Sequence, residues 1–201
     1  NVFANSDVAK TVALALGSGS NRIVIAGIGI ANNGGFSPAP TFNGVAMTLA
    51  KSHYVTYFAA LYYMLDADLP AAGTYNLSVD PVTAGRGGIW CLSLAGVKQQ
   101  APEATASGAG DSAGWTTPIT TITNNAWVID DVCSTDSAGY TAGSGQTERF
   151  DFLDATSTNQ CGSTKPVAVA GATSMGWTPS LSRVYTHVLA AFAEAPAGFF
   201  F

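Results

Sequence analysis

The most suggestive chemical motif in the chain is a serine between small residues, in the stretch Gly-Asp-Ser-Ala-Gly at 110–114. Ser112 stands where a serine protease holds its nucleophile, close to backbone N–H groups that bind an oxyanion. His53 and the aspartates between these two residues complete the order His, Asp, Ser. The residues around His53 lack the small side chains of such enzymes, and the stretch from His53 to Ser112 is too short for their double barrel. We therefore expect Ser112 to be a loop residue of a protein that is not an enzyme.

A second nucleophile and base, Cys161 and His187, are the pair that a cysteine protease uses. The interval between them is far too short for that class of enzyme, and the residues around Cys161 do not match it. His53 and His187 each stand alone in a predicted strand, without the spacing of metal ligands. We expect both histidines to have structural roles.

Several aspartates lie close enough in the sequence to meet at one end of a β-sandwich. Ca²⁺ takes roughly six to eight oxygen ligands, which carboxylates supply. No segment has the spacing of an EF-hand loop, so two interpretations stay open: a calcium site, or carboxylates in water. No other cofactor is expected. The candidate ligands are Asp130, Asp131, Asp136, Asp151 and Asp154.

The cysteines divide into two environments. Cys91 lies in an apolar segment and is expected to be a small buried side chain. Cys133 and Cys161 lie in segments rich in serine, threonine and glycine, where we predict a disulfide between them. That bridge would close a loop of about 29 residues, stabilise the fold by roughly 3–4 kcal/mol and indicate an oxidising compartment. Two free thiols are the alternative.

Four tryptophans offer aromatic faces for ligand binding. Trp90, Trp127 and Trp177 alternate with apolar residues in predicted strands, so we expect them in the core. Trp115 follows the Ala/Gly/Ser-rich stretch and is predicted to lie in a loop, where it could stack on a sugar ring.

The amino-acid composition argues against nucleic acid as a partner and against a membrane span. Of the 201 residues, 47% are hydrophobic and only 10% are charged, against the roughly 25% charged residues of average proteins. The net charge is −5, and the eight basic residues are scattered singly, which disfavours nucleic acid as a partner. No apolar stretch reaches the roughly 20 residues of a membrane span. The chain begins with Asn1 rather than methionine, from which we expect removal of an export signal.

The strand-like segments then define the fold. The run 21–30 is almost continuously apolar and β-branched, which predicts a strand buried on both faces. Asn43-Gly44 between apolar flanks predicts a tight hairpin, whereas 99–114 and 134–146 are expected to be loops. About ten or more short strands without a helical pattern predict one all-β domain over residues 1–201, a single antiparallel β-sandwich of the jelly-roll type. Residues 1–7 and 194–201 are expected to be extended terminal segments.

The order of several short segments resembles a known group of proteins. Asn21-Arg22 precedes a hydrophobic strand and is followed by these segments in turn: Thr41–Thr48, Leu69–Val79, Leu94–Val97 and Met175–Trp177. Over residues 8–193 this order resembles a widespread group of poorly characterised secreted and phage-tail-associated β-sandwich modules of bacteria. The resemblance implies a structural role on a surface, fibre or virion, and it implies no catalytic residues.

We therefore expect a secreted, extracellular structural subunit of a fibre, filament, cell surface or virion surface, with copies of itself as partners. The alternative is a carbohydrate-binding or adhesive module with surface glycans as partners. Apolar residues near the two ends are the candidate intersubunit contacts: Val2, Phe3, Phe199, Phe200 and Phe201. Burying each phenylalanine ring would be worth roughly 1.5–3 kcal/mol. A contact of this kind between unlike surfaces builds a filament if its rotation does not close, although the tail could also fold back on its own sandwich.

Overall fold

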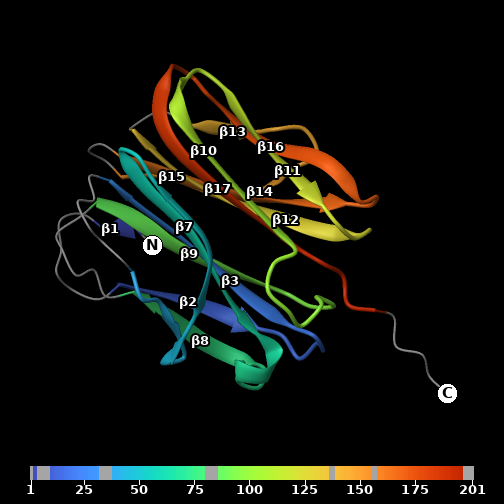
Figure 1. The fold of residues 1–201 in the computed structure, drawn as a ribbon. Coiled ribbons are helices and arrows are strands. Elements are labelled where there is room, and N and C mark those ends of the chain that lie inside the picture. Colours follow the sequence, from blue (N-terminus) through green and yellow to red (C-terminus); the bar gives the residue numbers. More distant parts are fainter. Residues whose placement is uncertain are drawn as a thin grey trace.

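The computed structural model describes residues 2–3, 10–31, 38–79, 86–135, 139–154 and 158–196. They form β-strands and a single 3-10 turn, η1 (Asp66–Asp68), and every strand pairing is antiparallel. The all-β prediction is confirmed. A single jelly-roll sandwich is not confirmed, because the strands form four open sheets (Figure 1).

The four sheets are named here by their position in the stack. The first outer sheet has the order β2 (Lys10–Leu16), β8 (Gly73–Val79), β4 (Thr41–Phe42), β5 (Val45–Ala46). The first central sheet has the order β1 (Val2–Phe3), β9 (Arg86–Leu94), β3 (Ile23–Ala31), β7 (Tyr57–Leu65), β6 (Thr48–Tyr54). The second central sheet has the order β10 (Ala104–Ser112), β17 (Arg183–Phe192), β12 (Ala126–Thr135), β15 (Thr158–Val167), β14 (Thr147–Asp154). The second outer sheet has the order β11 (Trp115–Thr121), β16 (Gly171–Pro179), β13 (Tyr140–Ala142).

The layers follow from which faces of each strand are apolar. The apolar run of β3 is buried over residues 23–30, because Val24 and Ile28 pack toward the first outer sheet while Ile23 and Ile25 pack toward the second central sheet. β12 is buried in the same way in the second central sheet. By contrast, β11 alternates strictly between buried and exposed residues, as expected of an outer strand with one wet face.

The predicted turn at Asn43-Gly44 is confirmed, with left-handed φ values of 51° and 79° joining β4 to β5. Asn125 also has a positive φ of 55°, but this turn leads from one sheet to another. β11 pairs with β16, and β12 pairs with β15 and β17, so the two strands that the Asn124-Asn125 turn joins do not form a hairpin.

Two further corrections concern segments with few apolar residues. The predicted loop 99–114 contains β10, an edge strand whose small side chains pair with β17 from Ala104↔Ala191 to Ser112↔Arg183. The predicted loop 134–146 contains the short strand β13. The polar segment around Cys161 is the strand β15, which is buried over residues 158–164. Two of its polar side chains, Gln160 and Ser163, hydrogen-bond to carboxylates of β12, as described below, and these bonds offset the cost of burying them.

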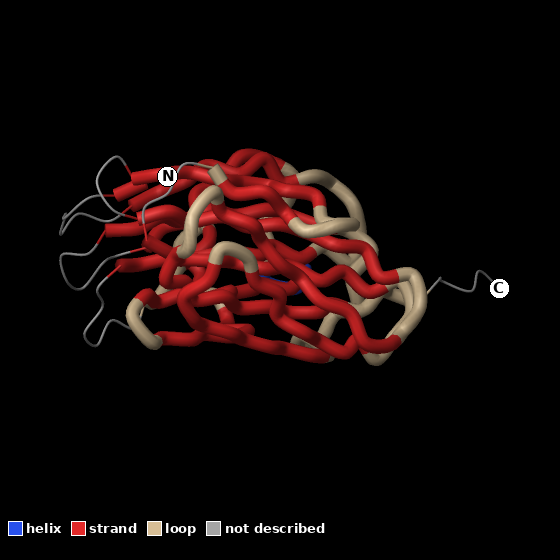
Figure 2. Tube along the Cα trace, turned by 90° about the horizontal axis from the view of Figure 1, so that it is seen from above, coloured by secondary structure: helices blue, strands red, loops and turns tan. Residues whose placement is uncertain are grey.

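The first and the last described segments of the chain lie at opposite ends of the molecule. β1 pairs with Gly87 and Gly88 near the start of β9, while the Ala195 N–H donates to the carbonyl of Gly96, just beyond the end of β9. Figure 2 shows the same separation along the length of the strands.

Most of the candidate intersubunit contacts are not tested by the structure. Phe199, Phe200 and Phe201 lie outside the described residues, so the prediction that they contact a neighbouring subunit stays a prediction. The side chains of Val2 and Phe3 also lie outside the described part, although the backbone of these two residues forms β1. Among the described residues, no helix is long and apolar enough to cross a membrane.

Candidate functional site

The serine motif spans the last three residues of β10 and the two-residue turn that leads to β11, so Ser112 ends a strand rather than lying in a loop. The Ser112 hydroxyl donates to the carbonyl of Gly114 at 2.6 Å, and the neighbouring Asp111 accepts a hydrogen bond from the Ser182 hydroxyl at 2.8 Å. His53 lies in β6 of the first central sheet, paired opposite Ala59. No hydrogen bond joins Ser112 to His53 among the described residues.

A buried chain of hydrogen bonds does resemble a catalytic triad in its residue types. The Asp130 carboxylate lies 3.0 Å from His187 Nε2, and His187 Nδ1 lies 2.8 Å from the Thr117 hydroxyl. In a hydrolase this order would give a nucleophile, a base and an orienting carboxylate. Here Asp130 and His187 are 0% exposed and Thr117 is 3% exposed, so no substrate reaches the hydroxyl. Sequence reasoning missed this arrangement, since the three residues come from different strands.

Further donors complete the surroundings of the Asp130 carboxylate. Its Oδ1 accepts the backbone N–H of Ser163 at 2.6 Å and the Ser163 hydroxyl at 2.8 Å, and its Oδ2 also accepts the Trp177 indole N–H at 2.8 Å. Four donors from three strands therefore meet on one carboxylate, counting His187. The cluster joins the second central sheet to the second outer sheet, because Trp177 belongs to β16. Charge-assisted hydrogen bonds of this kind offset the cost of burying the carboxylate.

Asp131 lies on the opposite face of β12, between the two central sheets. Its Oδ1 accepts the Trp90 indole N–H at 2.6 Å and the Gln160 amide N–H at 2.8 Å, while its Oδ2 has no hydrogen-bond partner. Burial raises the pKa of this carboxyl to about 7 against the opposing effect of these two hydrogen bonds, and the charge of Asp130 adds to the rise. Asp131 therefore holds its proton at mildly acidic pH.

These positions correct the calcium hypothesis. Successive residues of a strand point to opposite faces, so Asp130 and Asp131 cannot ligate one ion. Asp151 instead accepts the Tyr140 backbone N–H and the Asn159 amide N–H, both at 3.1 Å. The side chain of Asp154, and Asp136, lie outside the described residues. No group of three or more potential metal ligands occurs in the described part of the chain.

The cysteines also differ from the prediction. Cys133 and Cys161 are free and fully buried. In the register of β12 and β15, Cys161 lies opposite Val132 and Cys133 lies opposite Gln160. This offset of one residue sends the two thiols to opposite faces of the sheet, Cys133 toward the first central sheet and Cys161 toward the second outer sheet. The predicted disulfide is therefore absent.

The cysteine-protease pair is likewise separated. Cys161 and His187 lie on either side of Val132 in the sheet, in β15 and β17. Two strand spacings of about 4.8 Å separate their backbones. His187 makes its hydrogen bonds with Asp130 and Thr117 instead.

Two of the tryptophans, Trp115 and Trp127, differ from the positions expected from the sequence. Trp115 is only 6% exposed, and its ring stacks on Tyr185 with a centroid distance of 4.0 Å and an interplanar angle of 5°. It begins a strand rather than lying in a loop, so it cannot present a face to a sugar. Trp127, expected in the core, is half-buried and lines a surface cavity of about 500 Å³. Its place directly after the Asn124-Asn125 turn was the available signal.

The cavity around Trp127 opens between the ends of the two central sheets. Its rim carries Asn125 and Glu194, joined by a hydrogen bond of 2.7 Å from the Asn125 amide to the Glu194 carboxylate. Its remaining lining is apolar or backbone: Ala95, Gly96, Pro166, Val167 and Ala168.

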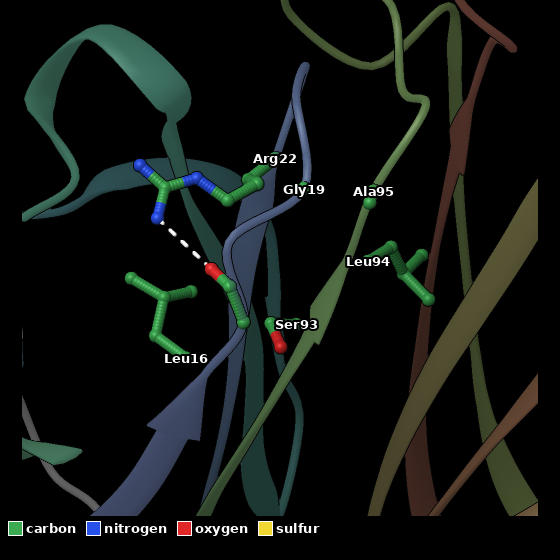
Figure 3. A pocket seen from close by; sticks show the side chains of 7 residues that line it. Leu16, Gly19, Arg22, Ser93, Leu94 and Ala95 are labelled. Carbon is green, nitrogen blue, oxygen red and sulfur yellow. Dashed lines mark hydrogen bonds between the residues drawn. The ribbon is translucent and has the colours of Figure 1, made fainter. Parts of the chain in front are cut away.

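A smaller cavity of about 120 Å³ lies on the other side of the Ala95-Gly96 turn (Figure 3). Its cation, Arg22, is already engaged, because its Nε bonds Asp66 at 2.7 Å and its Nη1 donates to the carbonyl of Gly17 at 3.1 Å. A third cavity of about 400 Å³ lies on the second outer sheet. There, Lys165 donates to the carbonyl of Ser174 at 3.0 Å, and Gln146 bonds both Ser163 and Gly176.

Comparison of the chain with protein-family models, with curated proteins and with solved structures finds no match. The arguments for function therefore come from this structure alone.

Proposed function

We propose that the protein is a non-enzymatic structural subunit that assembles with copies of itself, end to end, into an extracellular fibre, filament or virion surface. The observation that carries the proposal is the position of the chain at the two ends of β9. β1 lies beside Gly87 and Gly88, whereas Ala195 is bonded to Gly96. The six residue steps of extended strand from Gly88 to Leu94 alone span roughly 20 Å. β1 and Ala195 thus lie at opposite ends of β9, which is the arrangement that head-to-tail assembly requires.

The contacts made by the two buried aspartates support a structural role. Asp130 joins the second central sheet to the second outer sheet through Trp177, and Asp131 joins the two central sheets through Trp90. Each of these contacts holds two layers in register. A module that transmits load along a fibre depends on such fixed layers.

Exposed apolar side chains at the end of the molecule where Ala195 lies support a contact with a second copy. Two adjoining turns expose apolar side chains there, Ile122 at 68% and Val169 at 74%. The turns are tied together, because the Asn125 N–H donates to the Ala168 carbonyl at 3.2 Å. With only 10% charged residues in the chain, little electrostatic repulsion opposes such a contact. The free thiols of Cys133 and Cys161 remove the disulfide argument for an oxidising compartment.

Light scattering during size-exclusion chromatography tests the proposal. We expect the full chain to form oligomers that lengthen with protein concentration. Removing residues 197–201, which include Phe199, Phe200 and Phe201, or separately residues 1–3, should leave a folded monomer with an unchanged far-ultraviolet β spectrum. The double variant Ile122→Ser, Val169→Ser should weaken assembly without unfolding the chain. A full-length protein that stays monomeric at every concentration would overturn the proposal.

A further inference from the structure

We propose that the cavity lined by Trp127 binds one pyranose ring of a carbohydrate. This inference concerns recognition of a ligand and does not depend on self-assembly. It rests on an aromatic wall, a matched pair of polar groups on the rim, and a rigid backbone that holds both.

The aromatic wall is the part of the Trp127 indole that lines the cavity. Trp127 pairs across the sheet with Pro166 on one side and Phe192 on the other, which fixes its backbone at the end of β12. The other three tryptophans are between 1% and 6% exposed and therefore have no free face. A pyranose presents a flat set of C–H groups that can cover an indole ring, and binding sites of this size are mostly apolar with a few placed polar groups.

The polar pair on the rim offers both donors and acceptors. The bond from Asn125 Nδ2 to Glu194 Oε2 uses one hydrogen of the amide and one oxygen of the carboxylate. The second amide hydrogen, the amide oxygen and the other carboxylate oxygen stay available. Neighbouring sugar hydroxyls both donate and accept, so they can use all three. An ammonium group only donates, and it would leave the amide N–H facing a cation.

The rim is also fixed before a ligand arrives. Asn125 has a left-handed φ of 55°, a conformation that asparagine tolerates, and its N–H is bonded to the Ala168 carbonyl. Glu194 is held by an antiparallel bridge to Val97. A preformed site loses little conformational freedom on binding. The polar groups of the Arg22 and Lys165 cavities are instead occupied by internal hydrogen bonds.

Titration of ¹⁵N-labelled protein with methyl pyranosides tests the proposal through the indole N–H signals of the four tryptophans. The probes are the methyl glycosides of glucose, galactose, mannose and N-acetylglucosamine. We expect the Trp127 signal to move with a Kd on the order of 1 mM for at least one of them. The signals of the three buried tryptophans should stay in place and serve as internal controls.

Trp127→Leu, followed through the backbone N–H signal of Ala168 because it lacks the indole, should weaken binding of that probe at least about tenfold, and Asn125→Gly and Glu194→Gln should each weaken it several-fold. Glycine accepts the left-handed turn at 125, and the two rim variants keep the core intact, so the test does not depend on whether Trp127→Leu folds. Val169→Ser, on a neighbouring turn outside the cavity, is the matched control and should bind normally. The proposal is overturned if no pyranoside moves the Trp127 signal, if the rim variants bind like the wild type, or if methylammonium binds more tightly than every sugar.

Discussion

Replacing Asp131 by asparagine should remove a pH dependence from the stability of the fold. Asp131 is fully buried between the two central sheets, and burial raises the pKa of its carboxyl to about 7. In the unfolded chain the same group titrates near the usual aspartate pKa of about 3.9. Between these two values the folded protein holds a proton that the unfolded chain has released. The free energy of unfolding therefore falls as the pH rises through this window.

The size of the effect follows from the two pKa values. One proton contributes about 1.4 kcal/mol per pH unit, and the slope disappears as Asp131 ionises above about pH 7. Between pH 5 and pH 8 the wild type should lose about 2.5 kcal/mol that the variant Asp131→Asn keeps, because asparagine does not ionise. Urea unfolding of both proteins across this range measures the difference directly, and other titrating groups cancel in the comparison.

Asp130→Asn is the matched control, one residue away on the other face of β12. Four donors point at the Asp130 carboxylate, so an amide nitrogen in its place would face at least one of them. We expect this variant to lose roughly 2–4 kcal/mol of stability across the same pH range. If the difference between wild type and Asp131→Asn stays constant from pH 5 to pH 8, Asp131 does not hold a proton in the folded state and the reasoning fails.

Three further predictions concern packing, thiols and catalysis. Gly27→Ala should destabilise the fold by roughly 3–5 kcal/mol in urea unfolding, because a Cβ there would overlap the indole nitrogen that bonds Asp131, whereas Gly17→Ala, with open space around its Cβ, should have little effect. Cys133 and Cys161 should resist alkylation in the native state and react fully after unfolding without a reductant; a linked peptide in non-reducing mapping would show the register to be wrong. Ser112 should not react with a fluorophosphonate probe, and labelling of this residue would contradict its structural role at the end of β10.

Some elements are specified by residues that are neighbours in the sequence, and these elements were predicted correctly. The apolar, β-branched run of β3 predicted a strand buried on both faces, and Asn43-Gly44 predicted a turn with positive φ. Both signals come from neighbouring residues. β10 and β15 were not predicted because their burial depends on partners elsewhere in the chain: β10 pairs with β17, far later in the sequence, and Gln160 and Ser163 of β15 hydrogen-bond to the aspartates of β12.

The candidate sites could not be predicted for a related reason. The register between β12 and β15 decides that Cys133 and Cys161 face opposite layers, and no residue near either cysteine encodes that offset. The stacking of a second outer sheet buries Trp115, although its sequence neighbours are small and polar. Trp127 keeps an open side because it stands at the end of a strand between two sheets. Exposure in a layered fold is set by the order of the layers.

Negative-stain electron microscopy of the full chain, at the same protein concentrations as the proposed light-scattering experiment, tests the central claim most directly. The proposed structural role predicts unbranched rows of identical globules joined end to end, lengthening as the concentration rises. Rows should be absent from the variant that lacks residues 197–201. Single globules at all concentrations, or closed pairs related by a two-fold axis, would contradict head-to-tail assembly and with it the function proposed for this protein.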